Sequence, residues 1–340
     1  MDKSLADKLQ ELLSDRSRPL CIVGHTHPDG DAIGSALGLY HCLKNLEFAD
    51  VRVLMPDAYA SFLHWMPGND KVIIAEADSR AAGQAISNAG VLICVDFNGL
   101  SRAGLLEQHL RKSKAVKLMI DHHPEPEPGF DIYCSDVRAS STAELIYEVL
   151  EALNIHHSMD RNAAECLYAG ILTDTGSFSY SCNNPRTYEI IAKIMAEGVD
   201  GAHINRLIYS TYSLNRMRLL GYCLSEKLRV IGGHRAAFIS LTQDDLARFG
   251  YSEGDAEGIV NYALSIRNID LAALFMEKED HIKVSLRSYG DLDVNVLARK
   301  FYHGGGHKNA SGGKSFLGLE EALQQFESLV KEMEGDHAEA

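Results

Sequence analysis

The fold of the first half of the chain is decided by the stretch Leu20-Cys21-Ile22-Val23-Gly24-His25-Thr26-His27-Pro28-Asp29-Gly30-Asp31. It opens with a short apolar run, and residues 32–45 that follow place small and apolar side chains at helical spacing. The loop between them carries His25, Asp29 and Asp31. A buried strand that leads into a helix is the unit of a parallel α/β sheet. The sequence therefore predicts that one imidazole and two carboxylates emerge from the carboxyl end of a strand.

Three later segments repeat this arrangement of Asp or His directly after an apolar run. They are Asp96 after Val91–Val95, Asp121-His122-His123 after residues 116–120, and Asp174 after residues 169–172. Carboxylates and imidazoles delivered from several segments suit hard or borderline divalent metals. Two such metals held close together promote attack on phosphate esters. The four segments together therefore predict a metal site that acts on phosphate.

The apolar runs alternate with helical patterns, which indicates a sheet covered on both faces. Val51–Met55 is a further expected strand, and Ser79–Asn88 is an expected helix. Near-continuous apolar runs of this kind predict a doubly wound, mostly parallel sheet in the α/β class. Ligands bind such sheets beyond the carboxyl ends of the strands. The Asp and His side chains fall at those ends, so the fold and the site predictions agree.

The rest of the chain divides into a helical stretch and a smaller α+β domain with a mixed sheet. Ser141-Thr142-Ala143-Glu144 matches a capping box that opens a helix at 145–153, and helices follow at 161–172, 186–197 and 202–224. Beyond these lie two strand pairs, at 227–241 and 270–288, and helices at 294–301 and 319–333. We expect a catalytic domain at 1–199, a linker at 200–215, a second domain at 216–334, a disordered tail at 335–340, and an active-site cleft between the domains.

Composition narrows the class of protein. The formal net charge is −14, which argues against binding long nucleic acid through a broad basic surface. It leaves room for a short anionic ligand, because bound metals supply local positive charge. The seven cysteines include no Cys-x-x-Cys pair and are expected as buried free thiols. The first residues lack an apolar signal segment and no run is long enough for a membrane span, so a cytoplasmic protein is expected.

Each polar segment taken alone has a plainer structural interpretation. The loop at 25–31 could be an Asp- and Gly-rich turn, and Asp96 or Asp174 could cap a helix. His122-His123 could be a surface pair, as we interpret His156-His157, which no strand precedes and to which we assign no role. What favours the metal site is that every candidate falls at the end of an element facing one crevice.

The order and spacing of these segments resemble the four motifs of the DHH phosphoesterase superfamily. The segments Ser285-Leu286-Arg287-Ser288 and Gly304-Gly305-Gly306-His307 resemble its DHHA1 substrate-binding domain. The resemblance spans nearly the whole chain. It is closest to the nanoRNase/pAp-phosphatase branch, whose members hydrolyse very short oligoribonucleotides and 3′-phosphoadenosine 5′-phosphate (pAp).

The resemblance implies two divalent ions, with Mn²⁺ expected and Mg²⁺ or Co²⁺ as alternatives. The ligands of one ion are implied to be His25, Asp29 and Asp96. The ligands of the other are implied to be Asp31, Asp96, His122 and Asp174. Asp96 would then bridge the ions, and His123 would face the scissile phosphate or its leaving oxygen. His27 departs from the family pattern, where Asn is common, as does His303, where Gly often precedes the glycine run.

The same resemblance implies how the second domain holds a nucleotide. His307 is expected at the phosphate or base, and Arg287 and Ser288 at a phosphate. Glycines permit close approach, so the N–H groups of Gly304, Gly305 and Gly306 are expected to face an anion. Weaker candidates for contact are Arg102, Lys308 and Asn309. Taken alone, the glycine run could be a flexible turn and Arg287 a solvated strand end.

The expected activity is metal-dependent phosphoester hydrolysis by a bridging hydroxide. The substrates implied are single-stranded RNAs of about two to five nucleotides, giving nucleoside monophosphates, and pAp, giving AMP and phosphate. The expected enzyme resembles a 3′–5′ oligoribonuclease, although the polarity stays open. Long duplexes and membranes are not expected partners, and a homodimer is compatible with the family. The alternatives are a phosphodiesterase of linear or cyclic dinucleotides, an inorganic pyro- or polyphosphatase, and an inactive nucleotide-binding sensor.

Overall fold

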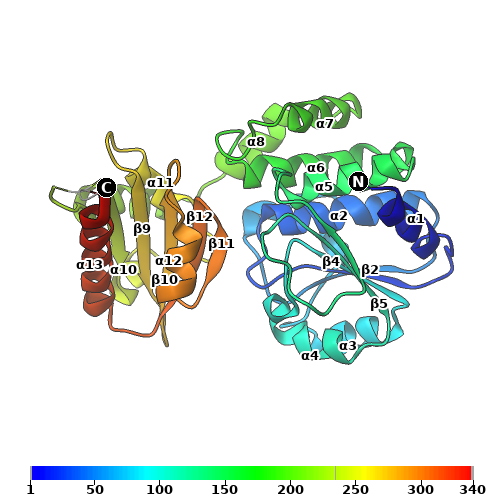
Figure 1. The fold of residues 1–340 in the computed structure, drawn as a ribbon, viewed down its shortest axis with the longest axis horizontal. Helices are drawn as coiled ribbons and strands as arrows, with labels where there is room; N and C mark the ends of the chain where they lie inside the picture. Colours follow the sequence, from blue (N-terminus) through cyan, green and yellow to red (C-terminus); the bar gives the residue numbers. More distant parts are fainter. Residues whose placement is uncertain (1, 234, 338–340) are drawn as a thin grey trace. The chain divides into compact units, whose positions relative to one another are not determined.

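The computed structural model describes residues 2–233 and 235–337 of the chain (Figure 1). Contacts divide the chain into a first unit, Met1–Thr211, and a second unit, Tyr212–Ala340. Each unit has its own six-stranded sheet and its own hydrophobic clusters. Within the described ranges, no helix combines the length and the apolar composition that crossing a membrane requires.

The sheet of the first unit is parallel throughout. Its strands are Leu20–Val23 (β1), Val51–Met55 (β2), Val72–Ile74 (β3), Val91–Val95 (β4), Val116–Asp121 (β5) and Ile132–Ser135 (β6). They lie in the order β3-β2-β1-β4-β5-β6, and every pair is parallel. The two central strands, β1 and β4, are buried at every position, which explains their continuous apolar sequences. The predicted doubly wound sheet is confirmed.

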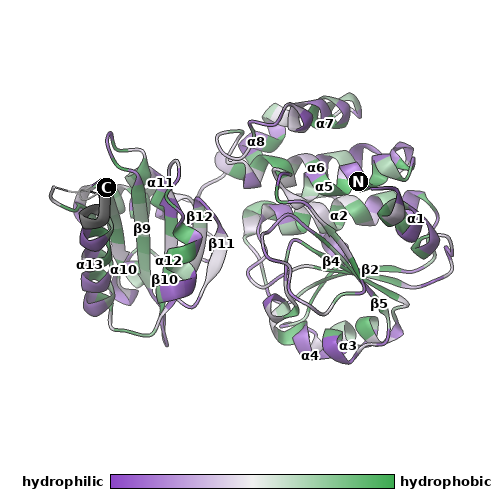
Figure 2. Cartoon of the chain, in the orientation of Figure 1, coloured by the Kyte–Doolittle hydropathy of each residue, from purple (hydrophilic) through white to green (hydrophobic). Residues whose placement is uncertain are grey.

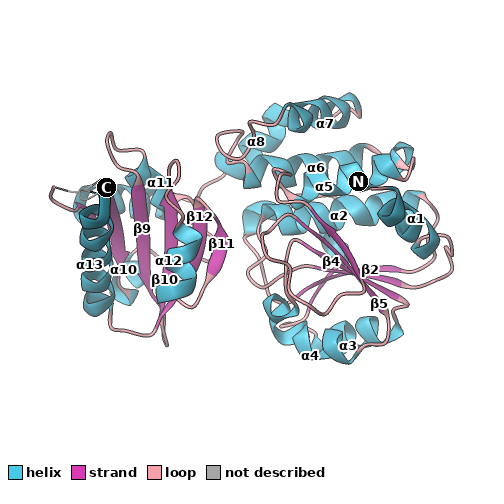
Figure 3. Ribbon diagram, in the orientation of Figure 1, coloured by secondary structure: helices cyan, strands magenta, loops and turns pink. Residues whose placement is uncertain are grey.

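Helices cover both faces of this sheet (Figures 1 and 3). One face carries α2 (Gly30–Asn45), α5 (Thr142–Ala152) and α6 (Arg161–Asp174), and the other carries α3 (Ser79–Asn88) and α4 (Glu107–Lys112). Helices α2 and α6 pack closely at Gly34, which has no side chain. A Cβ on Gly34 would lie 2.5 Å from the carbonyl oxygen of Cys166. The unit is completed by α1 (Lys3–Leu12), α7 (Pro185–Ala196), α8 (Gly201–Tyr209) and the 3₁₀ turns Ser61–Leu63, Asn69–Lys71, Leu100–Leu106 and His156–Ser158.

The strand order determines where the polar loops meet. The chain leaves β1 for α2 on one face of the sheet and leaves β4 toward α4 on the other. The carboxyl ends of these neighbouring strands therefore form the topological switch point at which doubly wound sheets bind ligands. Strand β5 lies beside β4 and ends at Asp121, so the segments after all three strands emerge at one edge of the sheet.

The second unit is built on a mixed sheet, as predicted. Its strands are Leu228–Val230 (β7), Ala236–Leu241 (β8), Leu271–Glu277 (β9), Ile282–Ser288 (β10), Gly305–His307 (β11) and Ala310–Ser315 (β12). They lie in the order β11-β12-β10-β9-β8-β7, with β8 and β9 parallel and the other neighbours antiparallel. The helices are α9 (Leu214–Tyr222), α10 (Gln243–Arg248), α11 (Ile259–Leu264), α12 (Val294–Phe301) and α13 (Leu319–His337), with a π turn at Cys223–Lys227.

Two apolar clusters flank this second sheet. Side chains of α12 and α13, including Leu297 and Phe326, form one cluster with β9 and β10. Side chains of α11, including Ile259 and Val260, form the other with β8 and β9. Figure 2 shows the amphipathic result, with β9 coloured as hydrophobic and the outer side of α13 as hydrophilic. The alternating apolar pattern of β10 is buried at every second residue.

Several elements differ from the sequence prediction. Helix α1 was not predicted. The edge strands β3 and β6 were not predicted either, because they are short and only partly buried. The helix expected at 202–224 is two helices, α8 and α9, separated at residues 210–213, and the boundary between the two units falls there. Helix α13 continues to His337, so the expected tail is helical at 335–337, while 338–340 lie outside the described residues.

Candidate metal centre

The loop after β1 places His25 and Asp29 at the edge of the first sheet. Nδ1 of His25 lies 2.7 Å from the carbonyl oxygen of Thr26, which assigns the proton to Nδ1 and leaves the lone pair on Nε2. That Nε2 is 3.3 Å from Oδ2 of Asp96 and 4.0 Å from Oδ1 of Asp29. Asp29 also caps α2 by accepting hydrogen bonds from the N–H groups of Asp31 and Ala32, each at 3.0 Å. The three candidate ligand atoms of His25, Asp29 and Asp96 form one compact donor set.

Asp31 lies in the first turn of α2 and is almost completely buried. Its carboxylate accepts hydrogen bonds from the first N–H groups of α5, from Thr142 at 2.6 Å and from Ala143 at 2.9 Å. Ser35 donates a third hydrogen bond, at 3.1 Å. The amino terminus of a helix favours negative charge, so α5 orients this carboxylate and stabilises its ionised form.

Asp96 occupies the centre of the cluster. It adopts a positive φ of 66°, which Asp tolerates better than most residues, directly after β4. Its Oδ1 accepts a hydrogen bond from the hydroxyl of Thr142 at 2.9 Å and lies 3.7 Å from Nε2 of His122, while its Oδ2 faces His25. Asp96 therefore belongs to a first donor set with His25 and Asp29 and to a second with Asp31 and His122, and it also lies in a third group with Asp121 and His123.

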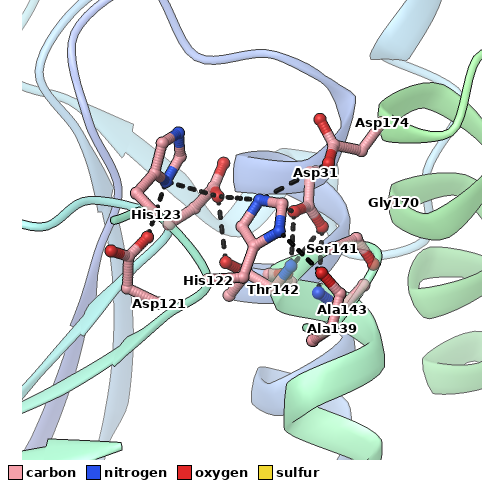
Figure 4. Close-up of polar contacts among 12 residues, drawn as sticks. Asp31, Asp121, His122, His123, Ala139, Ser141, Thr142, Ala143, Gly170 and Asp174 are labelled. Carbon is pink, nitrogen blue, oxygen red and sulfur yellow. Dashed lines mark hydrogen bonds and ion pairs between the residues drawn. The ribbon is translucent and has the colours of Figure 1, made fainter. Parts of the chain in front are cut away.

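His122 and Asp174 complete the second donor set (Figure 4). Nδ1 of His122 donates to the carbonyl oxygen of Ala139 at 3.2 Å, which directs Nε2 toward the carboxylates. Nε2 lies 3.4 Å from Asp174, 3.7 Å from Asp96 and 3.8 Å from Asp31. Asp174 is the last residue of α6, and its side chain is about one fifth exposed, at 22%. A backbone carbonyl that fixes the tautomer of a ligating histidine is a common feature of metal sites.

The second histidine of the pair, His123, points elsewhere. Its Nδ1 lies 2.7 Å from Oδ1 of the fully buried Asp121, and its ring makes an edge contact with His122. The same nitrogen is 3.8 Å from Asp96. Because Nδ1 is engaged by Asp121, Nε2 is the nitrogen that His123 can offer to a substrate. The expectation that the two adjacent histidines point in different directions agrees with this geometry.

The buried carboxylates of this cluster repel one another, and bound cations would relieve the repulsion. Burial, and then the charges of Asp31, Asp29 and Asp174, raise the pKa of Asp96 well above its ordinary value. Burial also raises the pKa of Asp31 to about 6, against the opposing effects of His122 and the N–H groups of α5. Carboxylate and imidazole donors crowded in this way suit divalent metal ions. The residues therefore fit divalent cations.

Arg102 brings positive charge to the same region. Its carbonyl oxygen accepts a hydrogen bond from the N–H of Thr26 at 2.8 Å, so the backbone beside Arg102 is fixed to the loop that carries His25. Burial lowers the pKa of His123 well below its ordinary value, and the charges of His122 and Arg102 lower it further. His123 is therefore held neutral at physiological pH in this environment.

The candidate substrate residues of the second unit lie around β10 and β11. Arg287 and Ser288 end β10, and the hydroxyl of Ser288 donates to the carbonyl oxygen of Leu292 at 2.6 Å. Asn309 donates from Nδ2 to Ser288 at 2.9 Å, and Lys308 forms an ion pair with Asp291 at 2.7 Å. Ser288 and Asn309 are thus joined in one hydrogen-bonded turn.

The glycines at 304 and 306 are required for steric reasons, in addition to the expected close approach to an anion. A Cβ on Gly304 would lie 1.9 Å from the carbonyl oxygen of Gly312, because β11 packs tightly on β12. The N–H of Gly304 donates to Ala298 at 3.1 Å, and that of Gly306 donates to Oδ1 of Asn295 at 3.1 Å. The amides of these two glycines therefore have acceptors inside the domain, which differs from the expected anion-facing amides. His307 ends β11 at the turn into β12.

Sequence reasoning missed the residues that orient the ligands. These are Ser35, Ala139, Thr142 and Ala143. The segment at 141–144 was interpreted only as a capping box. Ser141 does cap α5 by accepting from the N–H of Glu144 at 3.0 Å, but the carboxylate of Glu144 turns to Ser140 and Thr187 instead. The sequence carries no signal for these contacts, because Asp31 and Asp96 lie far from Thr142 along the chain and only the fold brings them together.

Comparison with known proteins agrees with this geometry. Residues 19–171 match the model of the DHH family, N-terminal domain, and residues 232–334 match the DHHA1 domain. The chain is 32% identical over 316 residues to the bifunctional oligoribonuclease and PAP phosphatase NrnA of Bacillus subtilis, covering 91% of this chain and 94% of that protein. This chain belongs to the DHH phosphoesterase family. It is accordingly a hydrolase that acts on phosphoesters, with side chains that can hold metal ions.

Other proteins with similar sequences or structures carry different descriptions. A solved structure described as an exopolyphosphatase-related protein from Bacteroides fragilis is 39% identical, with a TM-score of 0.92, and covers 97% of this chain and 96% of that one. The cyclic-di-AMP phosphodiesterase GdpP of Geobacillus thermodenitrificans is 25% identical, covering 96% of this chain and 49% of that protein. These similarities identify the fold and the class of chemistry more closely than the substrate.

Proposed function

We propose that this DHH protein hydrolyses short single-stranded oligoribonucleotides to nucleoside monophosphates, and pAp to AMP and phosphate. The observation that carries the proposal is the position of Asp96, whose Oδ2 faces His25 of the first donor set and whose Oδ1 faces His122 of the second. A shared carboxylate is what a two-metal phosphoesterase needs to hold its ions side by side. The relative from Bacillus subtilis, described as a bifunctional oligoribonuclease and PAP phosphatase, supports the choice of ester.

In this proposal the ligands divide between two ions, Mn²⁺ by preference. His25 and Asp29 would hold one ion, Asp31, His122 and Asp174 would hold the second, and Asp96 would be a ligand of both. Two bound divalent cations would lower the pKa of a water molecule and stabilise charge on the phosphoryl oxygens. The helix amino terminus at Thr142 keeps Asp31 ionised and correctly oriented for this task.

His123 and Arg102 act on the substrate rather than on the metals in this proposal. Asp121 holds His123 through Nδ1 at 2.7 Å, so Nε2 faces the scissile phosphate or its leaving oxygen. With its proton on Nδ1, facing Asp121, the neutral imidazole offers Nε2 as a hydrogen-bond acceptor and adds no charge. Arg102, with its permanent positive charge, supplies a contact to a phosphoryl oxygen.

The DHHA1 domain is proposed to hold the nucleotide end of the substrate. Arg287 and Ser288 contact a phosphate, and His307 contacts the phosphate or the base. The glycines Gly304, Gly305 and Gly306 allow the backbone to approach the ligand closely. Lys308 and Asn309 are secondary contacts, because Asn309 already ties the Ser288 turn and Lys308 is paired with Asp291.

Product analysis tests the proposal. The protein loaded with Mn²⁺ is incubated with pAp, di- to heptaribonucleotides, cyclic diadenylate and pyrophosphate, and products are separated by ion-exchange chromatography before and after chelation. We expect AMP from pAp, mononucleotides from the short RNAs, and no product with chelator. Asp96→Ala is expected to abolish turnover, whereas Asp70→Ala, a matched change at an exposed carboxylate, leaves it intact.

Three results would contradict the proposal. Full activity of Asp96→Ala with trace metal excluded would remove the metal centre from the mechanism. Preferred turnover of cyclic diadenylate or pyrophosphate would instead favour one of the alternative activities, a dinucleotide phosphodiesterase or an inorganic pyrophosphatase. Tight binding of a dinucleotide with no product after prolonged incubation with Mn²⁺ would make the protein a sensor.

A further inference from the structure

Two aromatic side chains meet on the surface of the second unit beside the glycine strand. The ring centroids of His303 and Phe316 are 5.4 Å apart, with the ring planes at 60°. Phe316 is 66% exposed, more than any other large hydrophobic side chain that the structure describes. His303 is also exposed. His303 comes two residues before β11, and Phe316 comes directly after β12. We call His303 and Phe316 the aromatic pair.

The framework beneath the pair is well anchored. Tyr302, which precedes His303, is completely buried. The backbone of His303 adopts a positive φ of 45°. The N–H of Lys314 donates to the carbonyl oxygen of Tyr302, and the N–H of Gly304 donates to Ala298 at 3.1 Å. The pair is therefore held at the surface by a rigid strand pair although neither ring contributes to the buried core. Strained backbone of this kind persists where the surrounding structure enforces it.

The surrounding sequence is basic in an acidic protein. Residues 294–316 contain Arg299, Lys300, Lys308 and Lys314 and no Asp or Glu, whereas the whole chain has a formal net charge of −14. All four cations are exposed. Lys308 pairs with Asp291, so its charge is partly neutralised. Within this stretch of sequence, cations accompany two exposed aromatic rings, and cations together with exposed aromatic rings are the combination that proteins use to bind single-stranded nucleic acid.

We propose that His303 and Phe316 form a stacking platform for a nucleobase of an oligoribonucleotide whose end is held near His307. This subsite rests on the proposed function and deepens it by naming a determinant of substrate length. Every base has a π face, so such a platform tolerates any sequence while each stacked base strengthens binding. The cations of α12 and β12 would attract the phosphates that join the stacked base to the rest of the strand.

The spacing along the strands sets which substrates reach the platform. Ala310 pairs with His307, and Phe316 comes six residues after Ala310, directly beyond the end of β12. At a strand rise of about 3.3 Å per residue, the platform lies roughly 13 to 20 Å from His307. A single nucleotide such as pAp is too short to span this distance. The platform therefore strengthens binding of longer oligoribonucleotides and leaves pAp unaffected.

The test compares substrates of different length on exposed-site variants. Binding of a fluorescein-labelled tetraadenylate is measured by anisotropy in chelator, and kcat and KM are measured for tetraadenylate and for pAp with Mn²⁺. We expect Phe316→Ala to weaken tetraadenylate binding about tenfold, with KM raised and kcat kept, and to leave pAp kinetics unchanged. Phe316→Trp is expected to restore binding because the stacking face is retained, and His303→Ala is expected to weaken it less than Phe316→Ala.

The control is Tyr262→Ala, which removes another exposed aromatic ring, 47% exposed, from helix α11 of the same unit. Equal loss from Tyr262→Ala, no loss from Phe316→Ala, or equal loss for pAp and tetraadenylate would each overturn the platform. A change in oligomeric mass of Phe316→Ala in size-exclusion chromatography with unchanged RNA binding would assign the pair to an interface between copies and also overturn it. If no RNA is hydrolysed but tetraadenylate binding still depends on Phe316, the proposed function fails and the platform stands.

Discussion

The hydroxyl of Thr142 donates to Oδ1 of Asp96 at 2.9 Å, while the N–H of the same residue donates to Asp31 at 2.6 Å. One residue thus orients a carboxylate shared by both donor sets and a carboxylate of the second set. Groups that orient ligands in this way typically change metal affinity 10- to 100-fold when removed. Helix α5 therefore determines the geometry of the centre although it supplies no ligand.

We expect Thr142→Val to lower the affinity for Mn²⁺ about tenfold or more. Valine has nearly the shape of threonine but no hydroxyl, so Asp96 loses its partner while the N–H contact to Asp31 remains. Thr142→Ser keeps the hydroxyl and should retain most of the affinity. Isothermal titration of the metal-free variants with Mn²⁺ measures the effect. Equal affinity in the valine and serine variants would show that the hydroxyl has no orienting role.

We expect Asp96→Asn to stabilise the metal-free protein at neutral and alkaline pH while removing metal binding. Burial and neighbouring carboxylates raise the pKa of Asp96, so the folded state keeps its proton where the unfolded state has lost it. The Asp96 carboxyl therefore destabilises the folded state increasingly as the pH rises from the ordinary carboxyl pKa to the raised one. Asparagine does not ionise, accepts the hydrogen bond from Thr142 and tolerates a positive φ.

The measurement is the difference in unfolding midpoint between Asp96→Asn and wild type in chelator, from pH 4 to pH 8. The difference should be small at the acid end and grow in favour of Asp96→Asn as the pH rises. Saturating Mn²⁺ should reverse the order, because only the wild type gains binding energy. A difference that stays constant with pH would mean that the Asp96 carboxyl titrates normally in the fold.

We expect Asp121→Asn to reduce kcat by roughly two orders of magnitude with little change in Mn²⁺ affinity. Asp121 holds Nδ1 of His123 at 2.7 Å, and an asparagine can present its amide to that nitrogen and favour the wrong tautomer. His123→Ala should have a comparable effect, and the double variant should lose no more than either alone. Additive losses in the double variant would mean that Asp121 acts independently of His123.

The sequence predicts the sheet of the first unit well because its central strands are buried on both faces. β4 begins and ends where its apolar run does, since a strand buried on both faces of a parallel sheet leaves no room for polar residues. Short edge strands such as β3 have no such constraint, and all three residues of β3 are only partly buried. The break between α8 and α9 was missed because both helices carry a helical pattern up to the break at 210–213.

The same contrast applies to the site. Ligands such as His25 and Asp96 are visible in the sequence because carboxylates and imidazoles directly after apolar runs are unusual. The groups that hold them are largely backbone atoms, such as the carbonyl oxygen of Ala139 and the N–H of Ala143, which every residue possesses. Only tertiary structure selects which backbone groups face the cluster. Residue type therefore predicts the ligands of such a centre better than it predicts what orients them.

The packing of α2 on α6 carries the last prediction, because these helices deliver Asp31 and Asp174. A Cβ on Gly34 would lie 2.5 Å from the carbonyl oxygen of Cys166 and 2.8 Å from the backbone nitrogen of Gly170, so Gly34→Ala must push the helices apart. Overpacking of this kind typically destabilises by about 1–3 kcal/mol. We expect a lower unfolding midpoint and weaker Mn²⁺ binding together, measured by thermal denaturation and calorimetry. Gly221→Ala is the control, since a Cβ there meets no heavy atom within 4 Å on helix α9, and alanine favours the helix. A Gly34→Ala protein with unchanged stability and Mn²⁺ affinity would show that the two helices can accommodate a methyl group at this contact.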